Sequence, residues 1–253
     1  MIDILIPKVP KKRSLLKYLK EIDKTKIYSN FGPLNSNLIS QIANWIGTDE
    51  SNLVTCSNAT LGLQGAVKTC ASSNNGSWNL PSWTFAATPT AIMNAGMKVK
   101  FVDVELDSWR VSTNAQLNNL VDVLPFGADL DFERKGILES IRLVDAAASF
   151  DALRNIEFPK KHKIGIVISL HATKLLPAGE GGVFVSNDVK WIERFKQWTN
   201  FGFNSTRDSR IIGNNAKLSE YSAAVALASL DEWDITRKAV SYTHLTLPTI
   251  LLV

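Results

Sequence analysis

One lysine of this sequence stands where a nucleophilic amine would be useful. Lys174 follows the apolar run 164–170 and precedes a glycine-rich turn at residues 179–182. A lysine in a dry, cation-rich pocket loses its proton more readily than one in water, and the free amine can form a Schiff base with a carbonyl group. The context of Lys174 therefore predicts amine-based covalent chemistry, with Ser169 and His171 just before it in the sequence.

A turn of small residues earlier in the chain is suited to an anion. Residues 56–59 read Cys-Ser-Asn-Ala, and Thr60 opens a helix predicted over residues 60–70. Small side chains let backbone N–H groups approach a phosphate, and a helix N-terminus adds positive potential. Ala59 and Thr60 are therefore candidate phosphate ligands, Thr60 through its hydroxyl as well. The same pattern is typical of an ordinary helix cap, so that interpretation stays open.

Two more residues suit a flat, cationic ring. Phe85 lies at a predicted strand-to-helix turn, where its ring either stacks on a cofactor or packs in the core. Asp145 ends the apolar run 141–144. A buried carboxylate needs a cationic partner, such as a protonated pyridine nitrogen; otherwise Asp145 caps the next turn. With Lys174, these residues predict a site for pyridoxal phosphate (PLP), whose ring withdraws electrons from a substrate carbon.

Other kinds of site find less support in the sequence. His171 either touches a cofactor or substrate or has a structural role. The chain has 3 histidines, one of them His244 in the last residues, which argues against a histidine metal cluster. Cys56 and Cys70 show neither a disulfide framework nor zinc-site spacing. Nucleophile-elbow, Walker and dinucleotide motifs are absent from the sequence.

These residues need a scaffold, and the hydrophobic pattern predicts an α/β fold. Helices are predicted at residues 14–22, 39–46, 60–70, 84–94, 189–198 and 218–230, with a charged helix over 231–239, and strands at 97–104, 120–124, 141–144, 164–170 and 182–186. Short apolar runs between helices indicate a mostly parallel sheet flanked by helices. In such sheets ligands gather at the carboxyl ends of strands, where Phe85, Asp145 and Ser169 fall.

Composition agrees with a globular protein that handles small anions. The 253 residues suffice for one large domain, or one domain and part of another, and the net charge of +4 does not by itself indicate nucleic acid. The basic cluster at residues 8–26 is either a solvated helix face or a rim that attracts a diphosphate. No apolar run reaches the length of a membrane span, and the N-terminal residues are too short for a signal peptide, so we expect a cytoplasmic protein.

The last residues differ from the rest of the chain. Residues 240–249 resemble the translation of a transposon-type sequencing adapter. We therefore expect residues 240–253 to be a non-native tail, which would mean that the natural chain was cut short. The alternative is a genuine β-prone tail.

In order and spacing, the motifs resemble the nucleotide-sugar aminotransferases of the DegT/StrS-like group, within the fold-type I PLP enzymes. The resemblance covers about residues 28–239 and rests on the segments 28–33, 57–60, 81–85, 101–104, 125–127, 144–147, 169–182 and 213–220. It implies a homodimer in which Ala59, Thr60 and Ser169 bind the cofactor phosphate and Asn215 reaches the phosphate of the partner's cofactor. It also implies that Phe85 stacks on the ring, Asp145 holds its nitrogen and Lys174 binds it covalently, with Tyr28 on the substrate side.

The resemblance implies transfer of an amino group from an amino acid such as glutamate to a nucleotide-linked keto-sugar, in the biosynthesis of cell-surface polysaccharides or secondary-metabolite sugars. The sequence departs from the family at Ala148, where Gln is usual, at Pro125 for a common His and at Ile39 for a common Glu. A PLP sugar dehydratase is an alternative that Lys174 argues against, since similar dehydratases have His there. A PLP-binding regulatory or non-catalytic relative is another, which Ala148 keeps open.

The same resemblance suggests a domain organisation. Residues 1–35 form an N-terminal segment, residues 36–239 the PLP-binding large domain, and the family's C-terminal small domain is missing. A chain truncated in this way would bind cofactor weakly, aggregate or be inactive, because apolar surface that the small domain covers would be exposed.

Overall fold

The structure is a computed structural model of the chain. It describes residues 6–71, 76–112, 117–132, 137–204 and 206–237. The tail predicted to be non-native, residues 240–253, lies outside the described residues.

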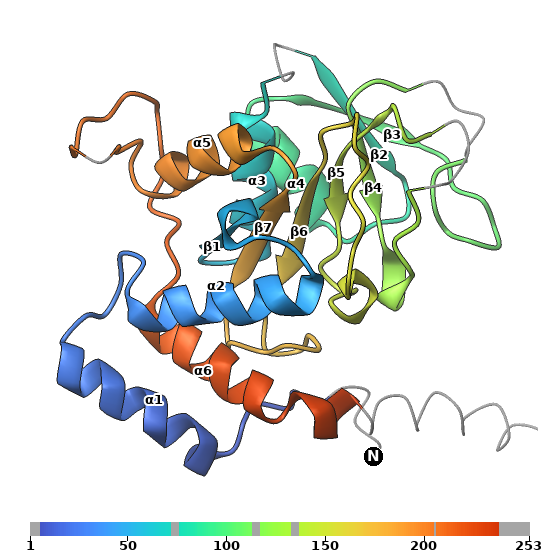
Figure 1. The fold of residues 1–253 in the computed structure, drawn as a ribbon. Coiled ribbons are helices and arrows are strands. Elements are labelled where there is room, and N and C mark those ends of the chain that lie inside the picture. Colours follow the sequence, from blue (N-terminus) through green and yellow to red (C-terminus); the bar gives the residue numbers. More distant parts are fainter. Residues whose placement is uncertain (1–5, 72–75, 113–116, 133–136, 205, 238–253) are drawn as a thin grey trace, which may run out of the picture.

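The described residues form one seven-stranded sheet in the order β1-β7-β6-β5-β4-β2-β3 (Figure 1). β7 runs antiparallel to both of its neighbours, and the other neighbouring pairs are parallel. The strands are β1 (Leu53–Cys56), β2 (Ser77–Pro81), β3 (Lys98–Val102), β4 (Leu120–Val123), β5 (Ile141–Asp145), β6 (Gly165–Ser169) and β7 (Gly182–Ser186). The prediction of a mostly parallel sheet is confirmed.

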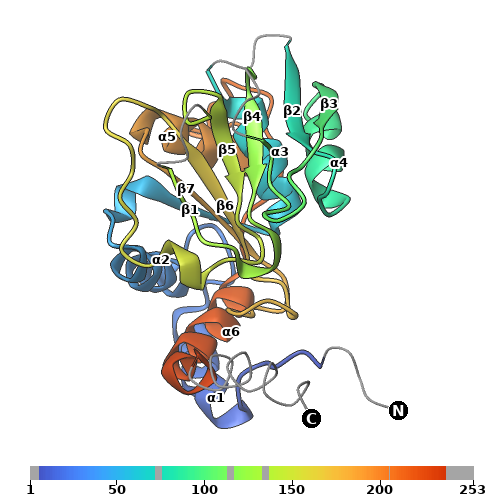
Figure 2. The same cartoon turned by 90° about the vertical axis from the view of Figure 1, so that its right-hand side faces the viewer.

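Helices cover both faces of this sheet. α3 (Ala59–Thr69), α4 (Ala87–Asn94) and α5 (Val189–Thr199) share one hydrophobic core with it, and α1 (Lys12–Thr25), α2 (Pro33–Ile46) and α6 (Glu220–Asp231) share the other. α1 lies against α6, away from the sheet (Figure 2). Short 3₁₀ turns occupy Glu50–Asn52, Pro125–Gly127 and Asp151–Leu153.

Alternation along the strands explains the two cores. In β7, Val183 and Val185 join the core with α2 and α6, while Phe184 between them joins the core with α3 and α5. Successive side chains of a strand point to opposite faces, so a strand buried on both faces is apolar throughout. All five residues of β7 are indeed buried, as the continuous apolar run requires.

A buried carboxylate determines how α2 begins. Glu220, in the first turn of α6, accepts hydrogen bonds from the backbone N–H groups of Leu34 (2.7 Å) and Asn35 (3.0 Å). These N–H groups have no partner within α2, and the N-terminus of a helix attracts negative charge. Gly32 lies so close that a Cβ there would come within 2.7 Å of the Glu220 carboxyl carbon. The junction of α2 and α6 therefore depends on residues far apart in the sequence.

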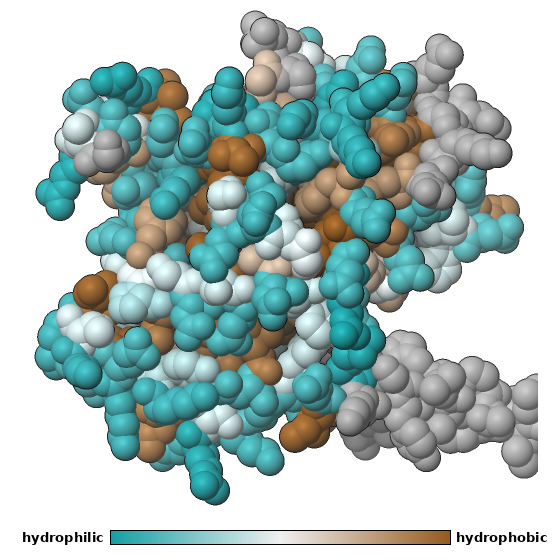
Figure 3. Space-filling model, viewed as in Figure 1, coloured by the Kyte–Doolittle hydropathy of each residue, from teal (hydrophilic) through white to brown (hydrophobic). Residues whose placement is uncertain are grey.

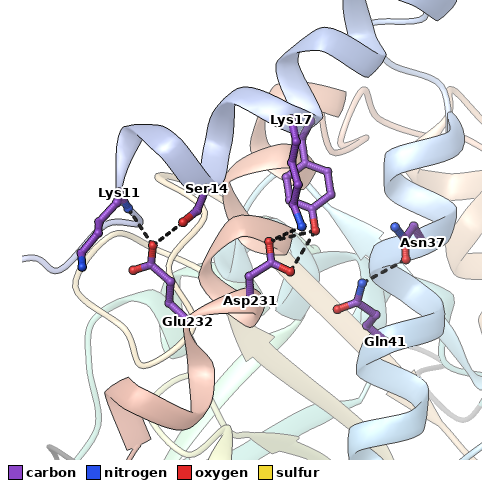
Figure 4. Close-up of polar contacts among 8 residues, drawn as sticks. Lys11, Ser14, Lys17, Asn37, Gln41, Asp231 and Glu232 are labelled. Atoms are coloured by element: carbon purple, nitrogen blue, oxygen red, sulfur yellow. Dashed lines mark hydrogen bonds and ion pairs between the residues drawn. The ribbon is translucent and has the colours of Figure 1, made fainter.

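Besides the apolar packing of Tyr18 and Ile22, polar contacts at the surface join the basic helix α1 to α6 and the residue after it (Figure 4). Asp231 accepts a hydrogen bond from the Tyr18 hydroxyl and lies 2.8 Å from the Lys17 amine. Glu232 accepts hydrogen bonds from Ser14 Oγ (2.6 Å) and from the backbone N–H of Lys11 (3.1 Å). The buried side chains of α1 are Tyr18 and Ile22, so most of its lysines face solvent.

The face of the molecule drawn in Figure 3 is mainly polar, with separate apolar patches. The most exposed large apolar side chains include Phe85, Leu106, Phe126 and Ile212. None of the helices in the described residues is both long enough and apolar enough to span a membrane.

Two strands were not given bounds from the sequence. β1 had no counterpart among the predicted elements, and β2 was implied only by the strand-to-helix turn predicted at Phe85, whereas the predicted strand at 182–186 coincides with β7. The helix predicted from residue 39 begins earlier, at Pro33, and the one predicted from residue 84 begins later, at Ala87. The helix predicted to run on to residue 239 is interrupted by a turn at Glu232 and resumes at residues 233–237.

Candidate functional site

Strand pairing alone brings three of the predicted site segments to the same end of the sheet. Cys56 at the end of β1 pairs with Gly182, and Gly182 pairs with Ser169 at the end of β6. Asp145 at the end of β5 pairs with Val167 of β6. The turn after β1 and the carboxyl ends of β5 and β6 therefore meet at the edge where parallel sheets bind ligands.

The turn after β1 presents free backbone donors. Asn58 caps α3 by accepting a hydrogen bond from Leu61 N (2.8 Å). Among the described residues, the N–H groups of Ala59 and Thr60 and the Thr60 hydroxyl have no hydrogen-bond partner. The cap and the anion site proposed for this turn are thus compatible, because they use different N–H groups.

A glycine in β7 lets this turn sit directly on the sheet. A Cβ at Gly182 would lie 2.9 Å from both the backbone nitrogen of Ala59 and the carbonyl carbon of Asn58. Both atoms belong to the backbone, so they cannot move aside as a flexible side chain would. The position of the N-terminus of α3 therefore requires glycine at residue 182.

Asp145 is a buried carboxylate held by two donors. The residue is 6% exposed, and it lies on the face of β5 that Leu143 shares with α3 and α4. Thr88 Oγ1 donates to Oδ2 (2.7 Å), and the backbone N–H of Ala147 donates to Oδ1 (3.1 Å). Burial raises the pKa of Asp145, while these two hydrogen bonds and the positive charge of Lys174 oppose the rise.

Lys174 lies on the loop that joins the antiparallel strands β6 and β7. The loop extends the strand pairing through hydrogen bonds from Leu170 N to Gly181 O (2.9 Å) and from Ala172 N to Gly179 O (2.9 Å). On its other side, Ser229 Oγ of α6 donates to Pro177 O (2.7 Å). The backbone on both sides of Lys174 is therefore fixed.

Asp145 and Lys174 line one cavity of about 370 Å³, within the usual size of small-molecule sites. The N-terminal residues of α3, Ala59 and Thr60, form another part of the wall. Phe85, which is 81% exposed, lines it as well. The remaining lining residues are Leu63, Trp83, Thr84, Ala87, Val123, Leu124, Pro125, Phe126, Ala147 and Ala148.

The chemistry of this cavity fits PLP. The free N–H groups and hydroxyl at the start of α3 suit a phosphate, and the buried carboxylate suits a cationic ring nitrogen. Lys174 supplies an amine, and Phe85 an aromatic face, within the same enclosure. A metal centre has no comparable support, since no group of three or more His, Cys, Asp or Glu side chains that could hold an ion occurs in the described part of the chain.

Four predicted residues are not among those that line the cavity. Ser169 is buried at the end of β6, and its Oγ accepts a hydrogen bond from His171 N (3.2 Å). His171 directs Nε2 toward Glu180 Oε1, 3.6 Å away. Tyr28 stacks on Tyr221, with ring centroids 6.3 Å apart. The basic residues of α1 do not line the cavity either, which favours a solvated helix face over a substrate rim.

The fourth is Asn215, an exposed residue that lies beside the phosphate turn. The next residue, Ala216, accepts a hydrogen bond from Ser57 N through its carbonyl oxygen (2.8 Å). Asn215 Oδ1 accepts a hydrogen bond from Lys217 Nζ (2.7 Å), and burial lowers the pKa of Lys217. The carbonyl side of the Asn215 amide is thus occupied within this chain.

Several lining residues were missed from the sequence. Trp83, two residues before Phe85, lines the same cavity, and so does Phe126. Thr88, which binds Asp145, had no signal of its own, because a threonine in the first turn of a helix is usually just a local feature. The spacing of Thr84 and Thr88, one helical turn apart next to Phe85, is the one pattern that could have drawn attention to them.

Comparisons with known proteins agree with this geometry. A protein from Bacillus cereus ATCC 10987, described as a PLP-dependent aminotransferase, superposes with a TM-score of 0.83 at 32% identity, over 92% of this chain and 67% of that one. The structure of DesI in the presence of its TDP-sugar product superposes with a TM-score of 0.79 at 28% identity, over 92% of this chain and 62% of that one. The fold is therefore that of the fold-type I PLP-dependent enzymes.

Sequence relatives lead to the same group. Protein Rv3402c of Mycobacterium tuberculosis is 28% identical over 251 residues, which cover 90% of this chain and 60% of the relative. The dTDP-4-amino-4,6-dideoxy-D-glucose transaminase of Shigella dysenteriae is 28% identical over 241 residues, covering 90% of this chain and 64% of the relative. The chain thus spans less than two thirds of the length of either relative.

The family model for the DegT/DnrJ/EryC1/StrS aminotransferases matches residues 11–122 and 143–249. These ranges contain the N-terminus of α3, Asp145 and Lys174. The chain therefore belongs to the DegT/DnrJ/EryC1/StrS aminotransferase family.

Proposed function

We propose that this protein is a PLP-dependent aminotransferase that moves an amino group from an amino acid, such as glutamate, to a nucleotide-linked keto-sugar. The observation that carries this proposal is that Asp145, Lys174 and the free N-terminus of α3 border the same cavity. The relative from Shigella dysenteriae is a dTDP-4-amino-4,6-dideoxy-D-glucose transaminase, and this supports the substrate class.

In this proposal each residue has a separate task. The N–H groups of Ala59 and Thr60, with the Thr60 hydroxyl, bind the phosphate, and Ser169 adds a hydroxyl from the end of β6. Phe85 would contact the ring and hold its orientation. Asp145 would hold a proton on the pyridine nitrogen, since an ion pair in a buried site offsets the burial cost of its carboxylate. PLP, when bound, supplies an electron-withdrawing ring that stabilises negative charge on the substrate α-carbon.

Lys174 has two functions in the same scheme. Its amine would hold the cofactor covalently. When it is free, the same amine would accept the proton from the substrate α-carbon as general base and would donate it again as general acid. The fixed loop backbone and the long side chain suit a group that must reach two neighbouring atoms in turn.

The assembly that we propose is a homodimer. Asn215 would donate its amide N–H₂ to the phosphate bound by the partner subunit, since its Oδ1 is already engaged by Lys217. Tyr28 would contribute to the substrate side. A cross-linking or sedimentation measurement that finds a monomer under conditions of full activity would contradict this part of the proposal.

Cofactor attachment is tested first. Purified protein is incubated with PLP and reduced with borohydride, and the modified peptide is identified by mass spectrometry. We expect the label on Lys174, loss of the label in Lys174→Ala, and no loss in Lys190→Ala, an exposed control on α5. A label on another lysine, or none in the wild-type protein, rejects the proposal.

Turnover then distinguishes the enzyme from its alternatives. Amino transfer is measured from glutamate to a panel of nucleotide-linked keto-sugars, with ketoglutarate and amino-sugar as products. Cofactor binding without transfer to any member of the panel favours a regulatory relative. Loss of a hydroxyl from the sugar without amino transfer favours a dehydratase.

A further inference from the structure

The buried carboxylate of Asp145 is the end of a chain of hydroxyl groups. Thr88 Oγ1 lies 2.7 Å from Asp145 Oδ2, and Thr84 Oγ1 lies 2.9 Å from Thr88 Oγ1. Thr88 is fully buried, whereas Thr84 lines the cavity. Thr84 lies in the turn from β2 into α4 and Thr88 in the first turn of α4, on the face of the sheet toward which Asp145 points. The three groups thus connect the carboxylate to the cavity wall.

The direction of these hydrogen bonds follows from counting protons. A threonine hydroxyl has one proton to donate. An ionised Asp145 can only accept, so the Thr88 proton must point to Oδ2, and Thr88 must then accept the proton of Thr84. Consecutive hydrogen bonds of this kind polarise and strengthen one another, and the effect is largest in a buried site. The chain Thr84–Thr88–Asp145 therefore favours the ionised form of the carboxylate.

We propose that Thr88, supported by Thr84, is a positioning residue that keeps Asp145 ionised and fixes which of its lone pairs remain free for a cationic ring. Thr88 occupies one acceptor site on Oδ2 and the Ala147 N–H occupies one on Oδ1. Each carboxylate oxygen has about two acceptor sites, so a site on each oxygen stays free. The charged group that acts on Asp145 among the described residues is Lys174.

The consequence for the cofactor rests on the proposed function. Without the Thr88 hydroxyl, Asp145 would bind a proton more strongly and would withdraw it from the pyridine nitrogen. The ring would then spend more time in its neutral form, which withdraws electrons less effectively. Thr88 would thus influence the reaction through Asp145, without touching the substrate.

The first test needs no cofactor. The side-chain carboxyl of Asp145 is titrated by ¹³C NMR in the cofactor-free protein and assigned with Asp145→Asn. We expect Thr88→Val to raise the pKa of Asp145 by about 1–2 units, the equivalent of one hydrogen bond to a charged group. Thr88→Ser, which keeps the hydroxyl, should titrate like the wild type. An unchanged midpoint in Thr88→Val would overturn the proposal.

Two other variants keep the proposal testable if Thr88→Val does not fold. Thr84→Val removes only the outer hydroxyl, near the cavity, and should raise the pKa of Asp145 by less than Thr88→Val does. Thr90→Val changes an exposed threonine of the same helix and should have no effect. If Thr88→Val does not fold, the other two variants decide. An Asp145 pKa that is unchanged in Thr84→Val but changed in Thr88→Ser would contradict the role of the Thr84–Thr88–Asp145 hydrogen bonds.

A second test uses PLP labelled with ¹⁵N in the ring. We expect the wild-type protein to show a protonated ring nitrogen near neutral pH, and Thr88→Val to show a smaller protonated fraction with about tenfold weaker PLP binding. Thr88→Ser should restore both. Failure of the wild type to bind PLP would reject the proposed function but leave the cofactor-free titration to decide the role of Thr88.

Discussion

Replacing Asp145 with Asn should stabilise the cofactor-free protein while it damages the site. The carboxylate is buried, and burial raises its pKa. Below the pKa of Asp in the unfolded chain, about 3.9, the group is protonated in both states and its burial carries no charge penalty. As the pH rises through the raised pKa of the folded state, the folded protein must hold a buried charge and loses stability.

The magnitude can be worked out from the contacts of Asp145. Asn keeps an acceptor for the Ala147 N–H, and its amide can donate to Thr88, whose proton then rotates toward Thr84. The hydrogen bonds survive the change, so what remains is the burial cost of the charge, reduced by its attraction to Lys174. We expect the free energy of unfolding to rise by about 1–3 kcal/mol at pH 7.

The assay is urea unfolding of the cofactor-free protein at several pH values. The gain of Asp145→Asn over wild type should shrink as the pH is lowered toward about 4. The exposed control Asp103→Asn should show no such trend. Saturating PLP should then stabilise the wild type more than the Asn variant, because the cationic partner is useful only to a carboxylate. A variant that is less stable than wild type at pH 7 would refute the reasoning.

Three further outcomes follow from contacts described above. Glu220→Gln should lower the free energy of unfolding by about 2–4 kcal/mol, because one backbone N–H of α2 would face an amide N–H₂. Glu232→Gln, at the partly exposed contact with the start of α1, should lower it by less than about 1 kcal/mol in the same urea titration. Gly182→Ala should weaken PLP binding at least tenfold in a fluorescence titration, because the new Cβ would displace the turn at Asn58 and Ala59. Gly181→Ala should weaken binding less, because its Cβ would meet only side chains, at 3.1 Å or more. Burial raises the pKa of Cys56 to about 12. In a variant without Cys70, the folded protein should therefore not react with Ellman's reagent at pH 8, whereas the urea-unfolded protein should react.

The sequence predicts the fold best where an element is long or uniformly apolar. The run that became β7 is buried along its whole length, and its bounds were predicted correctly. β1 has only four residues before a turn, and β2 carries Asn79 among its apolar residues and ends at Pro81. Neither shows alternation, because both lie in a sheet covered on two faces, so periodicity could not identify them.

The candidate site shows a similar division. Asp145 and Lys174 follow apolar strands, and that local pattern was enough to single them out. The contact between Thr88 and Asp145 joins residues 57 positions apart, and the cap of α2 by Glu220 joins residues more than 180 positions apart. Such pairs depend on tertiary packing, which no local pattern of a single sequence records.

The anchoring of the Lys174 loop has a consequence for how its amine moves. Strand-like pairing holds the loop on one side and the Ser229 hydroxyl of α6 holds it on the other. The amine then moves by rotation about the bonds of its own side chain, within nanoseconds, and does not need the slower opening of the loop. The amides of Ala172 and Ala178 donate to Gly179 O and Leu170 O, so we expect slow hydrogen exchange at both. In the same cofactor-free protein we expect fast relaxation of the lysine side chain. The Lys174 side chain would thus be mobile on a rigid loop backbone, and its amine could bind and release the cofactor without rearrangement of that backbone.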